Sequence, residues 1–90
     1  MRMQDYKQLL EKLKENKKWP QLYMFKFIAP NEDDKVKQVV SLLPKKGKVS
    51  YKHTKNLKFV SITCTASMPN AQSIVDITSK INQIEGIMSL

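Results

Sequence analysis

The sequence contains few of the residues from which enzyme active sites are built. Its 90 residues include two glycines, one cysteine and one histidine. Phosphate-binding loops and dinucleotide fingerprints need several closely spaced glycines, and zinc sites need a set of cysteine and histidine ligands. No serine nucleophile motif is present either. We therefore expect a non-enzymatic protein without catalytic residues, a cofactor or a metal site.

Long hydrophobic runs are also missing from the sequence. No window approaches the roughly 18 apolar residues of a membrane-spanning helix, and residues 1–6 lack the apolar segment of a signal peptide. A single cysteine forms no disulfide within the chain, which suits a reducing compartment. These features predict a cytoplasmic protein that does not enter a membrane.

Acidic residues and arginine are scarce. The chain has 8 Asp and Glu residues against 16 Lys and Arg residues, of which one is arginine, and its formal net charge is +8. A basic balance favours polyanionic partners. Arginine, however, is the preferred residue for bidentate recognition of bases and phosphates, so its scarcity argues against sequence-specific nucleic-acid binding. A lysine-rich surface is more often simply that of a soluble protein.

Residues 22–29 form the most apolar stretch, around which the rest of the chain is organised. Aromatic and branched side chains favour a β-strand here. Because both faces of this strand are largely apolar, we expect it at the centre of a sheet with a cover on each side. Pro30 ends the strand, and Asn31 is predicted to cap the next helix. The acids at 32–34 suit the positive end of that helix, and a metal site is the less favoured alternative.

Three segments show helical periodicity. Residues 4–16 form the first, with an apolar stripe of Tyr6, Leu9, Leu10 and Leu13. The second runs from Asn31 to Pro44. The third begins after a cap at Asn70 and ends at Gly86. Its buried stripe is predicted to contain Ile74, Ile77, Thr78, Ile81 and Ile84. Residues 87–90 then form a short last strand.

The segments 48–54 and 57–66 alternate between apolar and polar residues and predict a β-hairpin. The turn is expected at Lys55-Asn56, with Asn56 in a left-handed conformation. The apolar pattern selects a register that pairs Tyr51 with Val60 and Val49 with Ile62.

This register bears on the pair of Cys64 and His53, which is the one arrangement that suggests nucleophilic chemistry. Cys64 lies opposite Gly47, about 20 Å along the strand from His53, which is too far for a thiolate–imidazole pair. We therefore predict that Cys64 is a small core residue and that His53 is exposed near the hairpin tip.

The predicted order is strand, helix, strand, strand, helix, strand, preceded by an extra helix. This order favours an α+β, ferredoxin-like βαββαβ two-layer sandwich with an extra N-terminal helix. The chain is expected to be a single domain, 1–90, with an N-terminal helix and linker at 1–18 and the ferredoxin-like core at 19–90. The two main helices cover one face of the sheet. The other face is left for the N-terminal helix or for a second subunit, and we expect a homodimer.

Several segments together carry a family resemblance. A helix leads into Trp19-Pro20 and the strand from Tyr23 to Phe27, and later come the strand 60–63 and the closing run 84–87 that ends at Leu90. With these features the chain resembles the YbeD-like family of small bacterial proteins of unknown function. The resemblance implies a ferredoxin-like fold similar to ACT-type regulatory domains, which bind small effectors at subunit interfaces. ACT domains commonly have glycines after the first strand, where this chain has Ala29-Pro30-Asn31.

The sequence is compatible with two functions. The first is a non-enzymatic regulatory or adaptor module that binds a small effector or a partner protein. The alternative is an RNA- or nucleic-acid-binding domain that uses a lysine patch, with Tyr23 or Phe59 as stacking residues. The candidate polyanion-binding residues are Lys45, Lys46, Lys48, Lys52, Lys55 and Lys58. Since the strand that carries them is expected at a sheet edge, protection of that edge against aggregation is the favoured explanation of the lysines.

Overall fold

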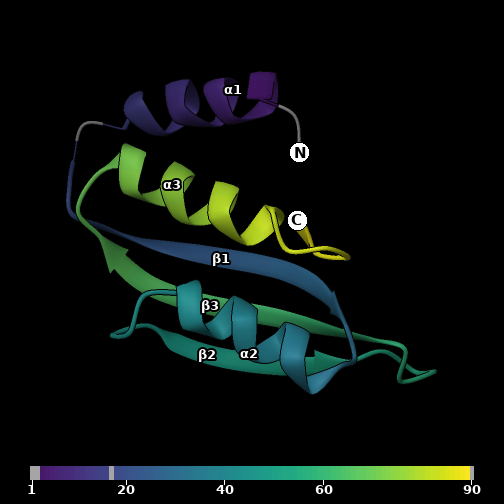
Figure 1. Cartoon of the computed structure of the whole chain (residues 1–90). Coiled ribbons are helices and arrows are strands. Elements are labelled where there is room, and N and C mark those ends of the chain that lie inside the picture. The colour runs from purple at the N-terminus through teal and green to yellow at the C-terminus, as the bar shows by residue number, and fades with distance from the viewer. Residues whose placement is uncertain (1–2, 17, 90) are drawn as a thin grey trace.

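The computed structural model describes residues 3–16 and 18–89 as a mixed α+β fold (Figure 1). Within these residues the chain forms three helices and one four-stranded antiparallel sheet. The elements are α1 (Met3–Lys14), β1 (Gln21–Pro30), α2 (Asp33–Leu42), β2 (Lys48–His53), β3 (Phe59–Met68), α3 (Ala71–Asn82) and β4 (Met88–Ser89). The strand order across the sheet is β2-β3-β1-β4, so β1 and β3 are central and β2 lies at an edge.

β1 has one buried and one exposed side. Phe25 and Phe27 are buried, whereas Leu22 and Met24 on the other side are exposed. This follows from the two-residue period of a strand, and β3 alternates in the same way. The sheet therefore has a covered inner face and an outer face that no described helix covers. Residues 22–29 therefore have the expected cover on the inner side, and the cover expected on the outer side is not provided by any described helix.

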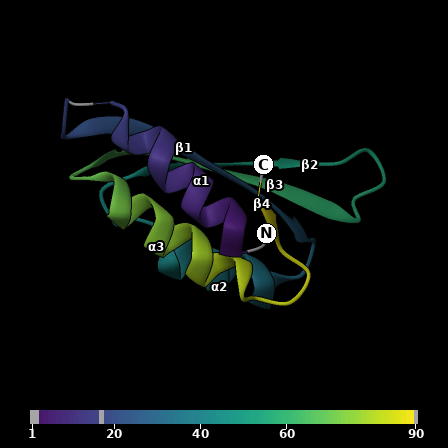
Figure 2. The ribbon, with the colours of Figure 1, turned by 90° about the horizontal axis from the view of Figure 1, so that it is seen from above.

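The described helices form one layer on the inner side of the sheet (Figures 1 and 2). α2 and α3 pack against the sheet, and α1 lies beside α3. The side-chain amide of Asn82 donates a hydrogen bond to the Tyr6 hydroxyl at 3.1 Å, and Leu9 reaches inner-face side chains of β1. α1 therefore extends the helical layer and does not cover the outer face. The expectation that the N-terminal helix packs on that face is therefore wrong for the described residues, and the second subunit stays a prediction.

The segment between α1 and β1 is tied down by two side-chain hydrogen bonds. The indole N–H of Trp19 donates to the carbonyl of Asn16 at 2.8 Å, and the side-chain amide of Asn16 donates to Oε1 of Gln21 at 2.7 Å. The Trp19-Pro20 peptide bond is cis. Because Trp19 also packs against the buried core, the hydrogen bonds and this contact together fix where the chain enters β1.

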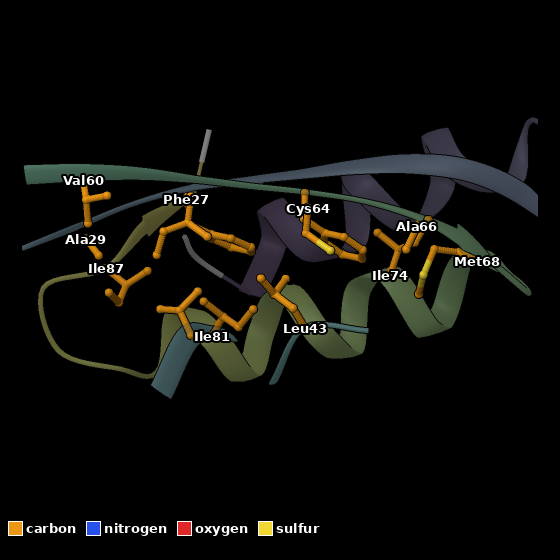
Figure 3. Packing of buried hydrophobic residues seen from close by; sticks show 13 residues of the cluster. Phe27, Ala29, Leu43, Val60, Cys64, Ala66, Met68, Ile74, Ile81 and Ile87 are labelled. Atoms are coloured by element: carbon orange, nitrogen blue, oxygen red, sulfur yellow. The ribbon is translucent and has the colours of Figure 1, made fainter. Parts of the chain in front are cut away.

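A cluster of buried side chains joins β1 and β3 to the helices on the inner side of the sheet (Figure 3). Its largest fully buried members are Phe25, Phe27, Val39, Val60, Ile62, Cys64, Ile74 and Ile81. Full burial of one such apolar side chain stabilises the fold by about 1.5–3 kcal/mol. The predicted stripe of α3 is confirmed, since Ile74, Thr78 and Ile81 are buried and Ile77 and Ile84 pack at its margin.

The register of the β2–β3 hairpin differs from the predicted one by two residues. Tyr51 lies opposite Ile62, and Val49 lies opposite Cys64. The predicted pairs of Tyr51 with Val60 and of Val49 with Ile62 are therefore wrong. A shift of two positions returns each side chain to the same face of the sheet. For this reason the predicted division of the hairpin residues between the two faces is correct although their pairing is not.

The loop of the hairpin explains this shift. Leu57 has the positive φ of 59° that was expected of Asn56. The side-chain oxygen of Asn56 instead accepts hydrogen bonds from the Thr54 hydroxyl at 2.8 Å and from the Lys58 N–H at 3.1 Å. Such side-chain bonds to nearby backbone stabilise a loop in place of a tight turn. The loop is thus centred one residue later than predicted, which moves the pairing by two.

The two asparagines that were predicted to cap helices differ in their roles. Oδ1 of Asn70 accepts the N–H of Ser73 at 2.8 Å, so Asn70 caps α3 as predicted. Asn31 does not cap α2, which begins one residue later than a cap at Asn31 requires. The backbone N–H of Asn31 donates a hydrogen bond to the Lys58 carbonyl at 2.9 Å, and the side-chain amide of Asn31 donates one to the Leu57 carbonyl at 2.8 Å. Asn31 therefore holds the hairpin loop against the end of β1.

The C-terminal part also departs from the prediction. α3 ends at Asn82, so Gly86 is not its direct C-cap. Gly86 has a φ of +86° in the turn that leads to β4, a conformation that L side chains rarely adopt. β4 spans Met88–Ser89 and pairs with β1, while residue 90 of the predicted last strand lies outside the described residues.

The cap of α3 gives a test of this local structure. We expect Asn70→Ala to lower the free energy of unfolding by about 1 kcal/mol, because the Ser73 N–H loses its acceptor. Glu32→Ala is the matched control. Glu32 occupies the cap position of α2 without a side-chain hydrogen bond to the helix. Glu32→Ala should therefore lower the free energy of unfolding by at most about 0.5 kcal/mol. Urea unfolding of both variants measures the difference, and equal losses would contradict the assignment.

Candidate functional site

The outer face of the sheet combines apolar, hydroxyl and cationic side chains. Because side chains alternate along each strand, its members follow from the burial pattern and the strand pairing. They are Leu22, Met24, Lys26 and Ile28 of β1, Phe59, Ser61, Thr63, Thr65 and Ser67 of β3, Lys48, Ser50 and Lys52 of β2, and Met88 of β4. The helical layer lies on the other side of the sheet, which leaves this face as the candidate site.

The strand register arranges these side chains in rows. An apolar row follows β1 and includes Leu22 and Met24, which are 73% and 60% exposed, and Met88 beside it on β4 is 63% exposed. A row of serine and threonine follows β3. A lysine row follows β2, with Lys48 opposite Thr65 and Lys52 opposite Ser61. Since neighbouring strands lie about 4.8 Å apart, the lysine row is about 10 Å from the apolar row.

Charge is divided unevenly between the two layers of the fold. The four strands, as the structure bounds them, contain no aspartate or glutamate. The acidic residues lie in the helices and in the segments that connect the elements, at Asp5, Glu11, Glu15, Glu32, Asp33, Asp34, Asp76 and Glu85. The outer face therefore presents Lys26, Lys48 and Lys52 without a carboxylate among the described strand residues. Its potential is positive, and it attracts acidic groups.

The six lysines that were predicted as one patch divide into three places. All six are exposed, and β2 is an edge strand as expected. Lys48 and Lys52 lie on the outer face. Lys45 and Lys46 precede β2, whereas Lys55 and Lys58 lie in the hairpin loop at its other end. Six strand residues separate these ends by about 20 Å, so the described structure does not gather the six side chains at one point.

The prediction missed Lys26, Met24 and Met88 as members of this surface. Lys26 lies opposite Thr63 of β3, which in turn lies opposite Ser50 of β2. Because Ser50 is halfway between Lys48 and Lys52, Lys26 lies level with the middle of the lysine row. A signal was present in the sequence, since residues 22, 24, 26 and 28 share one face of a strand with a period of two.

The aromatic residues do not form a shared stacking surface. Phe59 lies on the outer face and is 44% exposed. Tyr23, the other residue suggested for base stacking, lies on the inner face, where its ring meets Phe25 edge-on with centroids 4.9 Å apart. Burial raises the pKa of Tyr23. The suggestion that Tyr23 stacks on a base at the sheet surface is therefore wrong.

A small cavity lies beneath α1 on the inner side. Its volume is about 70 Å³. It is lined by Leu9, Tyr23, Phe25, Lys26, Phe27, Thr78 and Ser89. Pockets for small-molecule ligands usually enclose about 300–1,000 Å³. This cavity is well below that range.

Cys64 is a core residue, as predicted. It is fully buried on the inner face of β3, and burial raises the pKa of its thiol, so it carries little thiolate at neutral pH. His53 is exposed and lies opposite Val60, not opposite Lys58. The corrected register places Cys64 four residues along β3 from Val60, or about 13 Å, which still separates the thiol from the imidazole.

Within residues 3–16 and 18–89, no three or more His, Cys, Asp or Glu side chains are grouped closely enough to hold a metal ion. Among the described helices, none has the length and apolar character that a membrane span requires.

Residues 14–90 match a family model described as a protein of unknown function, DUF493. The chain belongs to this family. Its resemblance to YbeD-like proteins is consistent with this match. The matched range contains the whole sheet, α2 and α3, whereas α1 lies almost entirely outside it. No curated protein and no solved structure matches the chain.

The packing of Gly47 against Cys64 gives a test of the core position of the thiol. A Cβ at Gly47 would lie 2.5 Å from Sγ of Cys64. We expect Gly47→Ala to lower the free energy of unfolding by about 1–3 kcal/mol through overpacking. In a Cys64→Ala background, which lacks the sulfur atom, Gly47→Ala should lower the free energy of unfolding by at least about 1 kcal/mol less than it does in the original chain. Urea unfolding of the single and double variants measures this, and additive losses would contradict the contact.

Proposed function

We propose that the chain is a non-enzymatic cytoplasmic adaptor module that binds a partner protein through the outer face. We further propose that its fold is ferredoxin-like and similar to ACT-type domains. The order of elements after α1 and the strand order β2-β3-β1-β4 support this fold assignment. The observation that carries the function is the outer face itself, where exposed apolar side chains lie next to three lysines and no described helix covers them.

The apolar row favours a protein partner over a small effector. Leu22, Met24 and Met88 are each more than half exposed. Grouped exposed apolar side chains with a polar surround are typical of interaction surfaces. The cavity of about 70 Å³ beneath α1, by contrast, is small for an effector of ordinary size.

A homodimer through the outer face is the alternative protein partner. Each chain carries a formal charge of +8, and stacking two outer faces would bring Lys26, Lys48 and Lys52 of both copies into one interface. Like charges at an interface oppose association. We therefore favour a different protein as the occupant, and the homodimer stays a prediction that sedimentation tests.

Nucleic-acid binding is the second candidate. The observation that favours it is the positive outer face, which has three lysines and no carboxylate among its described strand residues. Lysines of this kind neutralise phosphate groups and so favour nucleic-acid binding. Base stacking, however, needs aromatic side chains on the sheet, and Phe59 is the one aromatic residue among the outer-face members given above.

Site-specific photo-cross-linking in the source cells tests the proposal. A photoreactive residue replaces Met24 or Ser50 on the outer face, and the matched control carries it at Gln38, an exposed position of α2 on the helical side. We expect adducts from positions 24 and 50 that protease removes and nuclease does not. Purified adducts should contain the chain and one other polypeptide in a fixed ratio.

The other outcomes decide between the alternatives. Adducts that nuclease removes would establish the nucleic-acid function instead. Adducts of the chain with itself would establish the homodimer. Adducts that form equally from position 38, or from no outer-face position, would overturn the outer face as the binding site.

A further inference from the structure

We infer that the outer face binds an amphipathic α-helix with an acidic flank, presented by a partner protein. This inference rests on the proposed function and adds the chemical class of the partner. It follows from the charge of the outer face and from the spacing of its apolar and lysine rows, taken together.

The apolar row on β1 and β4 provides the hydrophobic half of the interface. Leu22 and Ile28 lie six residues apart on β1, or about 20 Å, with Met24 between them. Met88 lies opposite Ile28 and widens this row at one end. An α-helix rises 1.5 Å per residue, so about four turns of helix are needed to follow the row. Side chains at i, i+3, i+4 and i+7 of such a helix form the matching stripe.

The lysine row on β2 provides the electrostatic half. Lys48 and Lys52 lie four residues apart, or about 13 Å along the strand. Two carboxylates separated by seven or eight residues on a helix lie about 10–12 Å apart and match this spacing. Because the described strands carry no acidic residue, these lysines have no carboxylate neighbour within the sheet. An acidic flank of the partner supplies the carboxylates that the strands lack.

The distance between the two rows fits the width of a helix. The rows stand about 10 Å apart, and an α-helix with its side chains is about 10–12 Å across. Between them, β3 presents the short side chains of Ser61, Thr63 and Thr65. A helix that lies along β3 thus contacts long side chains on both flanks and hydroxyl groups beneath it. Lys26 interrupts the apolar row and places a third cation beside the helix.

The same features make other occupants less suitable. A second copy of the chain brings a matching set of lysines and not the acidic groups that the face attracts. A single-stranded nucleic acid provides acidic groups but leaves the aliphatic row without a stacking partner, because Leu22, Met24 and Ile28 have no aromatic ring. An acidic amphipathic helix satisfies both rows at once.

A peptide selection on the full chain tests this inference. The probe is a displayed library of helix-forming peptides of about 16 residues with randomised surface positions. We expect the enriched peptides to carry aliphatic residues at helical spacing and acidic residues on one flank. Fluorescence anisotropy then gives their affinities, which should fall as salt is raised.

Two triple variants with the same net charge separate a local effect from a general one. Lys26→Glu, Lys48→Glu and Lys52→Glu change the outer face, and Lys12→Glu, Lys37→Glu and Lys80→Glu change exposed positions of α1, α2 and α3. Each substitution removes two units of positive charge, so both triples carry +2 in place of +8. The outer-face triple should weaken peptide binding by about tenfold or more, and the control triple by less than about twofold.

Amide NMR spectra establish that each triple is folded. If the three glutamates disturb the sheet, Lys48→Gln with Lys52→Gln on the edge strand replaces that variant, and an affinity loss of about threefold or more is expected. Enriched peptides without an acidic flank, or equal losses in the outer-face and control variants, would overturn the inference. Tighter binding of oligouridylate than of any selected peptide would overturn it in favour of nucleic acid.

Failure of this inference differs from failure of the proposed function. If protein adducts form at positions 24 and 50 but no acidic helical peptide is enriched, the partner is not an acidic helix and the adaptor function stands. If no adducts form at these positions, both are overturned.

Discussion

The structure depends on the antiparallel pairing of β1 with β3. The two strands pair over ten residues, from Gln21 opposite Met68 to Pro30 opposite Phe59. This register places Phe25 and Phe27 next to Cys64 and Ile62 on one face, where the helices cover them. It also places Met24 and Lys26 next to Thr65 and Thr63 on the other face. A shift of one residue in this pairing would move every side chain of one strand to the opposite face of the sheet. The β1–β3 register therefore determines both which side chains are buried in the core and which are exposed on the outer face.

Much of this arrangement could be predicted from the sequence because it repeats with a clear period. The inward side chains of β3 and the buried stripe of α3 follow directly from alternation and from helical spacing. The cap at Asn70 also followed, since an asparagine before a regular apolar stripe is a strong local signal. Such features depend on residues that are neighbours in the sequence, and their physical causes are local.

The errors have causes that the local pattern does not contain. Asn31 has the chemistry of a cap but bonds to Leu57 and Lys58, which are 26 and 27 residues away in the sequence. The hairpin register changed because Asn56 bonds to its own loop and Leu57 takes the positive φ. What covers the outer face could not be predicted, because Leu22, Met24 and Ile28 are apolar, and apolar character alone does not tell whether a surface is covered within the chain or by a partner.

The segregation of charge connects the fold to the proposed function. Acidic residues at the start of α2 stabilise the positive end of that helix, a role that the strands do not offer. Lysines on an edge strand discourage pairing between sheets of different molecules. Edge protection accounts for Lys48 and Lys52, but it does not account for Lys26, which lies on a central strand that is paired with β3 along its whole length. Lys26 lies at the centre of the outer face beside an exposed apolar row, and it is therefore the lysine on which the proposal of an acidic partner chiefly depends.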